Sequence, residues 1–443
     1  MRALAPCAPS HRAHRDIPAC RVFALSGMPS PVTRMAVAIA VLLSLAAASA
    51  PPAAGAAAGL TARLAAAMRS AGRYSGAYVV DASAGRTVFS WRGGTRRILA
   101  SNTKLFTSSA ALARFGPAGT LRTEVRGVGF LDPSRVWHGD LYLVGGGDPT
   151  FGSQRFDRRN YGGGATVESL AAGVAAAGIR SVTGHVYGDE SHFDSRRGGP
   201  ASGFRTSIYV GPLSALDYDR GLASERGGAF QANPPLFAAG RLRSALARRG
   251  IRVVGASRTG RAPAGSRPLA GVASPSMARL VQLTNKPSDN FFAEMLVKDL
   301  AMRATGRGTT RGGARIAAGF ARGLGVRPQL VDGSGLSRGD RASPRGIVRL
   351  LTRMRVRPEF PALYSSLPIA GSDGTLSHRM GRGPARGRCR AKTGTLSNVS
   401  ALSGFCLARS GHTYAFSILM NAVRPLPARA LQDRMAQAIA GSG

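Results

Sequence analysis

A serine and a lysine three residues apart are the first candidates for chemistry in this sequence. Only four lysines occur among its 60 basic residues: Lys104, Lys286, Lys298 and Lys392. Arg stays protonated in proteins, whereas a desolvated Lys can lose its proton and act as a base. Ser101 and Lys104 open an apolar, helix-like run, and one helical turn brings their side chains together. A serine hydroxyl beside a lysine amine is a nucleophile with its base.

Two further motifs, Ser288-x-Asn290 and Lys392-Thr393-Gly394, follow along the chain. The first is expected to open a helix and the second to lie on a strand. Each motif alone is a weak signal. Because two of only four lysines fall in two different motifs, coincidence explains the set poorly.

The motifs suggest a role for each catalytic side chain. Ser288 is expected to relay a proton between Lys104 and a leaving amine. Asn290 is expected to position either Lys104 or a substrate amide. Lys392 is expected to supply a second positive charge, which lowers the pKa of its neighbours.

The strand that begins near Lys392 is expected to bind substrate. An extended peptide can add to such a strand through main-chain hydrogen bonds. The hydroxyls of Thr393 and Thr395 are expected to hold a substrate carboxylate, and Gly394 belongs to the same binding segment. The backbone N–H groups of Ser101 and Thr395 are expected to form the oxyanion hole.

Composition limits the class of protein. The chain has 443 residues, of which 44% are hydrophobic, so it is long enough for two or three domains. The net charge is +38. A charge this high suits an anionic membrane or wall polymer, but a solvated, arginine-rich surface without a specific partner is the simpler interpretation. No nucleic-acid motif accompanies this charge and aromatic residues make up 6%, so no nucleic-acid partner is expected.

The histidines show no H-E-x-x-H pattern, and His185 and His192 are interpreted as surface polar residues. No metal or cofactor is expected.

The N-terminus predicts export. Arg34 precedes an apolar run over 35–45, and Ala48-Ser49-Ala50 follows. A positive residue, a short apolar core and an A-x-A end are typical of a secretory signal. The run is too short for a permanent anchor, which takes about 20 apolar residues. We expect translation to start at Met28 or Met35, and the chain to reach the periplasm or the outer face of the cytoplasmic membrane and cell wall.

The patterning predicts a mixed α+β fold. A hairpin over 76–81 and 87–91 and three strands over 388–395, 399–408 and 413–421 are expected to form one five-stranded antiparallel sheet. Helices near the two termini, over 59–72 and 428–439, should cover one face. A helix capped by Ser101 and ending at Gly116, with its neighbours, should cover the other face. Residues 121–275 have the texture of a mostly β insert.

Cys389 and Cys406 are the two cysteines beyond the predicted signal. They lie on predicted strands that flank a turn near Ser397-Asn398, nearly opposite one another. An exported chain favours a disulfide between them. Two buried thiols remain the alternative.

The chain resembles the class C, DacB-like penicillin-binding proteins, which are D-alanyl-D-alanine carboxypeptidases and endopeptidases. The three motifs match the S-x-x-K, S-x-N and K-T-G signature of penicillin-binding proteins and serine β-lactamases. Longer segments also match: LYLVGGGDPT at 141–150, GDESxFD at 188–194, SDNFFAEML at 288–296, DGSGLSR at 332–338 and RAKTGTLSNVSALSG at 390–404.

The resemblance covers about residues 55–440 and implies a β-lactamase/transpeptidase-like domain split by a β-rich insert. The expected parts of the chain are a lead and signal over 1–50, transpeptidase-like segments over 51–120 and 276–443, and the insert over 121–275. The implied activity is hydrolysis of peptidoglycan stem peptides ending in D-Ala-D-Ala through a Ser101 acyl-enzyme. β-Lactam antibiotics are the implied inhibitors. The balance between trimming free stems and cutting cross-links stays open.

Three other functions are compatible with parts of these sequence patterns. A serine β-lactamase or esterase shares the motifs, but residues 291–391 contain only Glu294 and Glu359, and neither lies in an E-x-x-x-N loop. A stable penicilloyl adduct is therefore expected. The G-x-S-x-G match at Ser337 lacks the strand before and the helix after that a nucleophile elbow needs. A non-catalytic basic wall-binding protein is disfavoured by the intact motifs.

Overall fold

The computed structural model describes residues 52–443. The predicted signal and start sites lie outside the described residues. Residues 53–443 form one compact unit. Among the helices of the described part, none is long and apolar enough to cross a membrane.

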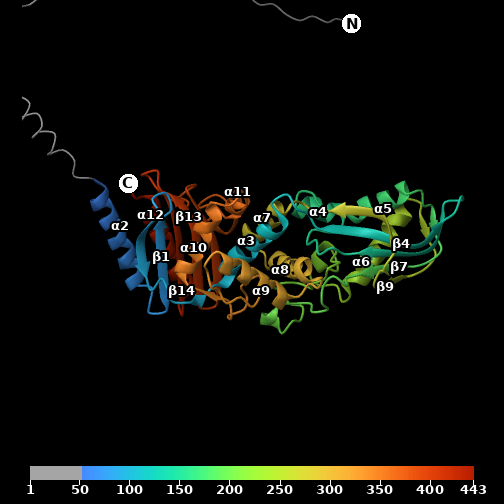
Figure 1. The fold of residues 1–443 in the computed structure, drawn as a ribbon, viewed down its shortest axis with the longest axis horizontal. Coiled ribbons are helices and arrows are strands. Elements are labelled where there is room, and N and C mark those ends of the chain that lie inside the picture. Colours follow the sequence, from blue (N-terminus) through green and yellow to red (C-terminus); the bar gives the residue numbers. More distant parts are fainter. Residues whose placement is uncertain (1–51) are drawn as a thin grey trace, which may run out of the picture. The chain divides into compact units, whose positions relative to one another are not determined.

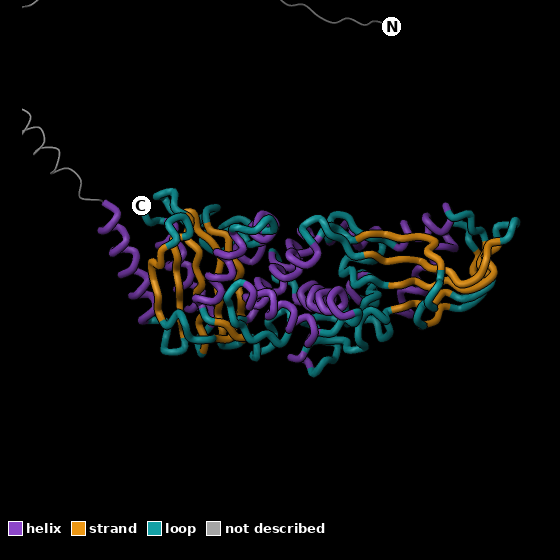
Figure 2. Tube along the Cα trace, in the orientation of Figure 1, coloured by secondary structure: helices purple, strands orange, loops and turns teal. Residues whose placement is uncertain are grey.

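A five-stranded antiparallel sheet joins the two ends of the described chain (Figures 1 and 2). Its order is β12-β13-β14-β1-β2, which confirms the predicted sheet. β1 lies beside β14 in the register Tyr78↔Ser417, so strands more than 300 residues apart are neighbours. The strands are β1 (Ser75–Asp81), β2 (Arg86–Trp91), β12 (Cys389–Leu396), β13 (Val399–Leu407) and β14 (Thr413–Asn421).

Helices cover both faces of this sheet, as predicted. α2 (Pro52–Arg69) and α12 (Pro425–Ala440) lie on one face, at the left of Figure 1. The spacing of Leu60 and Leu64 along α2 places both side chains in the core with Met435 and Ile439 of α12. α10 (Pro344–Arg355) packs on the opposite face against β1, β13 and β14.

A cluster of helices stands on the α10 side of the sheet and carries Lys104 and Asn290. α8 lies against α3 and α9, and α7 against α3 and α11. α8 is hydrophobic around most of its circumference, so Phe291, Met295 and Leu296 are buried as predicted. The helices are α3 (Thr103–Phe115), α7 (Met277–Asn285), α8 (Asn290–Thr305), α9 (Thr310–Gly323) and α11 (Phe360–Ser366).

The start of α3 differs from the prediction. Ser101 lies in the 3₁₀ turn η1 (Ala100–Asn102), and the first α-helical residue is Thr103. The N-cap position belongs to Asn102, whose side chain makes no capping bond. The prediction that Ser101 caps the helix is therefore wrong. Ala100 adopts a left-handed φ of 47°, which turns the chain just before Ser101.

Residues between β4 and β10 form a second, seven-stranded sheet, at the right of Figure 1. The path β10-β4-β5-β6-β8 is extended by β7 beside β5 and β9 beside β7. The predicted bounds of the transpeptidase-like segments, 51–120 and 276–443, and of the insert, 121–275, remain predictions. The strands are β4 (Arg122–Leu131), β5 (Val136–Val144), β6 (Ser181–Val182), β7 (Val186–Asp189), β8 (Arg252–Val253), β9 (Ser257–Thr259) and β10 (Arg267–Ala273), and the helices are α4 (Gln154–Asn160), α5 (Val167–Ala176) and α6 (Pro234–Arg248).

Short elements complete the frame. β3 (Arg97–Ile98) pairs with β11 (Arg341–Ala342) just before the Ser101 turn. Three further 3₁₀ turns are η2 (Pro200–Ser202), η3 (Asp219–Gly221) and η4 (Gly374–Leu376).

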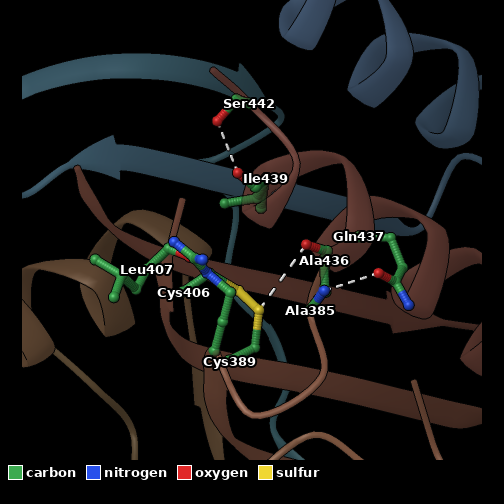
Figure 3. The surroundings of a disulfide bond; sticks show 9 residues. Ala385, Cys389, Cys406, Leu407, Ala436, Gln437, Ile439 and Ser442 are labelled. Atoms are coloured by element: carbon green, nitrogen blue, oxygen red, sulfur yellow. Dashed lines mark hydrogen bonds between the residues drawn. A yellow bond between two sulfur atoms is a disulfide. The ribbon is translucent and has the colours of Figure 1, made fainter. Parts of the chain in front are cut away.

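A disulfide joins Cys389 on β12 to Cys406 on β13 (Figure 3). The two residues are direct partners in the strand register, and both are fully buried. Cys389 packs against α12 near Ala436. The bridge therefore links β12, which carries Lys392, to β13. The structure contains the disulfide and not the alternative of two free thiols.

Candidate active site

Lys104 is fully buried at the first turn of α3 and reaches three acceptors. Its Nζ lies 3.1 Å from Ser101 Oγ, 2.8 Å from Asn290 Oδ1 and 2.7 Å from the Ser334 carbonyl oxygen. The structure thus brings Ser101, Lys104 and Asn290 together from two motifs. Of the two roles predicted for Asn290, this geometry matches the one that positions Lys104.

The arrangement suits a neutral amine as well as an ammonium. A neutral amine has two N–H donors and one lone pair. Asn290 Oδ1 and the Ser334 carbonyl can accept the two N–H bonds, which leaves the lone pair of Lys104 facing the Ser101 hydroxyl. That is the geometry in which an amine takes a proton from a serine.

Burial lowers the pKa of Lys104 to about 8. The nearby carboxylates of Asp332, Asp289, Glu294 and Asp340 oppose this shift, because they favour the charged amine. The neutral amine is consequently far more abundant near neutral pH than it is for an ordinary lysine.

Ser288 and Lys392 form a second pair beside the first. Lys392 Nζ donates to Ser288 Oγ at 2.8 Å and to the Thr393 carbonyl oxygen at 3.0 Å. Ser288 adopts a left-handed φ of 64°, a strained conformation for a serine. Burial, and then the proximity of Lys104, lower the pKa of Lys392 well below its usual value. A standing positive charge on Lys392 is thus disfavoured in the unliganded site.

β12 runs directly beside the Ser101 turn. Asn102 Nδ2 donates to the Lys392 carbonyl oxygen at 3.1 Å. A Cβ on Gly394 would lie 3.0 Å from both the Ser101 nitrogen and the Leu99 carbonyl oxygen. Glycine at this position therefore allows the close approach of strand and turn.

Ser101 lies between two cavities. One, of about 780 Å³, extends from Ser101, Ser288 and Asn290 toward the inserted segment and is lined there by Tyr209. The other, of about 450 Å³, lies on the side of Thr393 and Gly394. Both cavities include Ser101, Ser288 and Thr395 in their walls.

The smaller cavity gathers hydroxyl and guanidinium groups. Thr393 Oγ1 lies 2.7 Å from Thr375 Oγ1, and Arg429 of α12 donates to Thr395 Oγ1 at 3.1 Å. Arg379 also lines this cavity. Hydroxyls and a guanidinium at one point are what a carboxylate requires.

Sequence reasoning missed five residues that surround the motifs. Glu294 and Asp332 lie in the segments SDNFFAEML and DGSGLSR, so those segments held a usable signal. Arg220, Thr375 and Arg429 stand in no motif, and only the folded chain brings them to the site. Glu294 lines the larger cavity from α8, one turn after Asn290.

Comparison with known proteins matches a family model described as the D-Ala-D-Ala carboxypeptidase 3 (S13) family over residues 57–227 and 228–441. A D-alanyl-D-alanine carboxypeptidase of Actinomadura sp. (strain R39) is 32% identical over 445 positions, covering 82% of this chain and 80% of the relative. The chain belongs to the S13 family. It is a DacB-like penicillin-binding protein and a serine-type D-Ala-D-Ala carboxypeptidase, as predicted.

Other similar proteins agree with this S13 assignment. A carboxypeptidase of Mycobacterium tuberculosis is 31% identical over 371 positions, covering 78% of this chain and 76% of the relative. The crystal structure of penicillin binding protein 4 (dacB) from Haemophilus influenzae superposes with a TM-score of 0.72 at 21% identity, covering 84% of this chain and 97% of that one. This likeness confirms the predicted fold class.

Proposed function

We propose that Ser101 is the nucleophile of this S13 carboxypeptidase and Lys104 its general base. The observation that supports this proposal most directly is the position of Lys104 Nζ. It lies 3.1 Å from Ser101 Oγ and is held on its other sides by Asn290 and Ser334. Geometry and a lowered pKa are the two requirements for such a base.

Acylation follows from these contacts. The Ser101 proton moves to the Lys104 lone pair while Oγ attacks the carbonyl carbon of the penultimate D-Ala. The N–H groups of Ser101 and Thr395 are proposed to stabilise the oxyanion. When the C–N bond breaks, the leaving amine receives a proton from Lys104 through the Ser288 hydroxyl, which Lys392 orients.

Deacylation repeats these steps with water. Lys104, neutral again, takes a proton from the attacking water, and it returns this proton to Ser101 Oγ as the acyl–Oγ bond breaks. Glu294 lines the cavity, but it does not lie in the E-x-x-x-N loop of β-lactamases, and its carboxylate holds the backbone N–H groups of Gly333 and Ser334. A β-lactam acyl-enzyme, whose tethered leaving amine stays nearby, is therefore expected to be long-lived.

The proposed substrate is a peptidoglycan stem peptide ending in D-Ala-D-Ala. The name of the Actinomadura relative supports this substrate. The terminal carboxylate would be held by Thr393, Thr395 and Arg429 in the smaller cavity, and the rest of the stem would extend along β12 into the larger cavity. A bound carboxylate would favour the protonated form of Lys392 beside it. β-Lactams are the proposed inhibitors, supported by the Haemophilus influenzae protein solved with a β-lactam.

Cleavage of cross-links is proposed as a second reaction of the same site. The smaller cavity has a volume of about 450 Å³. His378 and Arg379 extend its wall beyond Thr393. A leaving group larger than D-alanine, such as the amine of a second stem peptide, is proposed to occupy the same side of Ser101.

We also propose an exported location, in the periplasm or at the outer face of the membrane and wall. The net charge of +38 supports attraction to anionic lipid or wall polymers. Such attraction is screened within about 8 Å at physiological salt. Retention on anionic cell-wall fragments should fall steeply as salt rises, and salt-independent retention would contradict this proposal.

The test of the nucleophile is the intact mass of the purified protein after incubation with benzylpenicillin. We expect one stable penicilloyl group per chain, on the peptide that contains Ser101, and none in Ser101→Ala. Ser337→Ala is the matched control, because Ser337 lies in the G-x-S-x-G segment and should keep the adduct.

Other outcomes would replace the proposal. Consumption of penicillin without an adduct would indicate a β-lactamase with a deacylation base. An adduct that persists in Ser101→Ala would exclude Ser101 as the nucleophile.

A further inference from the structure

Glu294 is a fully buried carboxylate that the proposed reaction steps do not use. It stands on α8 one turn after Asn290, which already contacts Lys104. Its Oε1 accepts backbone N–H bonds from Gly333 at 3.1 Å and from Ser334 at 2.9 Å. Burying a carboxylate costs free energy unless such bonds compensate for the lost water.

The turn that Glu294 holds is the one that supplies an acceptor to Lys104. The Ser334 carbonyl oxygen accepts from Lys104 Nζ at 2.7 Å, and the Gly333 carbonyl oxygen accepts from Thr107 Oγ1 at 2.8 Å. Glu294 therefore binds the N–H side of this turn while α3 binds its C=O side. The orientation of the Ser334 carbonyl depends on both sets of bonds.

Packing allows little freedom for this turn. A Cβ on Gly333 would lie 2.4 Å from the Ala293 carbonyl oxygen, so the turn rests directly on α8. A Cβ on Gly335 would meet the Ala100 carbonyl oxygen, so the same loop also rests on the Ser101 turn. Asp332 holds the loop from within, through the N–H groups of Gly335 and Ser337.

We propose that Glu294 is a positioning residue for the general base: by holding the 333–334 turn, it aims the Ser334 carbonyl at Lys104 and so directs the amine lone pair to Ser101. This inference rests on the proposed function of Lys104. It assigns Glu294 no contact with substrate, because both of its hydrogen bonds go to the turn.

The charge of Glu294 also acts on Lys104. Burial raises the pKa of Glu294 to about 7, with Asp332 adding to the shift. Glu294 in turn favours the charged form of Lys104, together with Asp332, Asp289 and Asp340. Lys104 lowers the pKa of the neighbouring Lys392. Lys298 also interacts with Glu294.

Two substitutions separate the hydrogen bonds from the charge. Glu294→Gln keeps an oxygen acceptor for Gly333 and Ser334, and its amide nitrogen replaces Oε2, which has no hydrogen-bond partner within residues 59–443. Glu294→Leu is similar in size but removes both acceptors. Glu359→Gln is the control, because Glu359 is a buried carboxylate that pairs with Arg357 away from the motifs.

The measurement is the rate of acylation by benzylpenicillin as a function of concentration and pH, with thermal unfolding of each variant. For Glu294→Leu we expect the limiting acylation rate to fall about 100-fold, because a misplacement of about 1 Å costs that much. The concentration for half-maximal rate should change little. For Glu294→Gln we expect a limiting rate within about threefold of wild type. The rise of its acylation rate with pH should begin at lower pH than in wild type, because Lys104 loses a neighbouring negative charge and its pKa falls.

Defined outcomes would overturn the inference. A wild-type limiting rate in folded Glu294→Leu would remove the positioning role. If that variant does not fold, folded Glu294→Gln remains as the test. A pH dependence of acylation identical to that of wild type would exclude an effect of Glu294 on the pKa of Lys104. Failure of the underlying function looks different: wild type would then take no penicilloyl group, or Ser101→Ala would keep it.

Discussion

Arg220 and Asp289 form a two-pronged ion pair, with Nη1 2.5 Å from Oδ2 and Nη2 3.0 Å from Oδ1. Arg220 lies in η3, between β7 and β8 of the inserted sheet region, whereas Asp289 stands between Ser288 and Asn290. Asp289 also caps α8 by accepting from the Phe292 N–H. The Asp289 carboxylate therefore links the S-x-N motif to Arg220. Arg220 in turn holds Asp289 next to the strained residue Ser288.

This pair predicts that Arg220→Lys slows acylation without unfolding the protein. Lys cannot make the two parallel bonds, so Ser288 and Asn290 lose part of their alignment. We expect the limiting rate of penicillin acylation to fall about tenfold, with a loss of stability of about 1 kcal/mol. Arg197→Lys is the matched control, because Arg197 makes the same two-pronged bond to Glu190. Equal rates in both variants would contradict a role for Asp289.

Acylation should depend on the proton of Lys104. Because burial lowers its pKa to about 8, the neutral base becomes more abundant as pH rises, and the acylation rate should rise up to about pH 8 and then level. Lys104→Arg should lose about 10²- to 10⁴-fold at every pH, since Arg stays charged. Stopped-flow acylation from pH 6 to 9 measures both. A rate independent of pH in wild type would argue against Lys104 as the base.

Arg429 should contribute to recognition of the substrate carboxylate. A charge-assisted bond to Arg429 near Thr395 predicts that Arg429→Ala raises KM for a D-Ala-D-Ala peptide about tenfold. The preference for the free acid over the peptide amide should fall by a similar factor. Arg434→Ala, an exposed substitution on the same helix, should change neither quantity. An unchanged preference in Arg429→Ala would place the carboxylate elsewhere.

The Cys389–Cys406 disulfide should stabilise the fold more than it serves catalysis. The bridge closes a short loop, with a sequence separation of 17, between two paired strands. Replacing both residues by Ala should lower the free energy of unfolding by about 2–4 kcal/mol. Below the melting temperature acylation should persist, because β12 keeps its pairing with β13. Denaturant titration with and without reductant measures the difference, and lost acylation in a folded variant would show that the bridge positions Lys392.

Some of the fold could be predicted from local patterns. β14 has the bounds predicted from its apolar run, and α8 begins where the Pro287-Ser288-Asp289 signal places it. The start of α3 could not be predicted, because Asn102 is drawn to the Lys392 carbonyl by a contact across 290 residues. Tertiary hydrogen bonds of this kind outweigh the preference of Ser101 for a cap position.

By itself, the sequence determined which chemistry is available and where along the chain it lies. Three ordered motifs, two of which contain a rare lysine, identified Ser101, Lys104, Ser288, Asn290 and Lys392, because residue type and local spacing are properties of the chain. Only the tertiary structure decided that Asn290 contacts Lys104 and that Ser288 contacts Lys392. It alone brought Glu294, Arg220 and Arg429 to the site. Burial and long-range contacts set pKa values and orientation, and no local pattern encodes them.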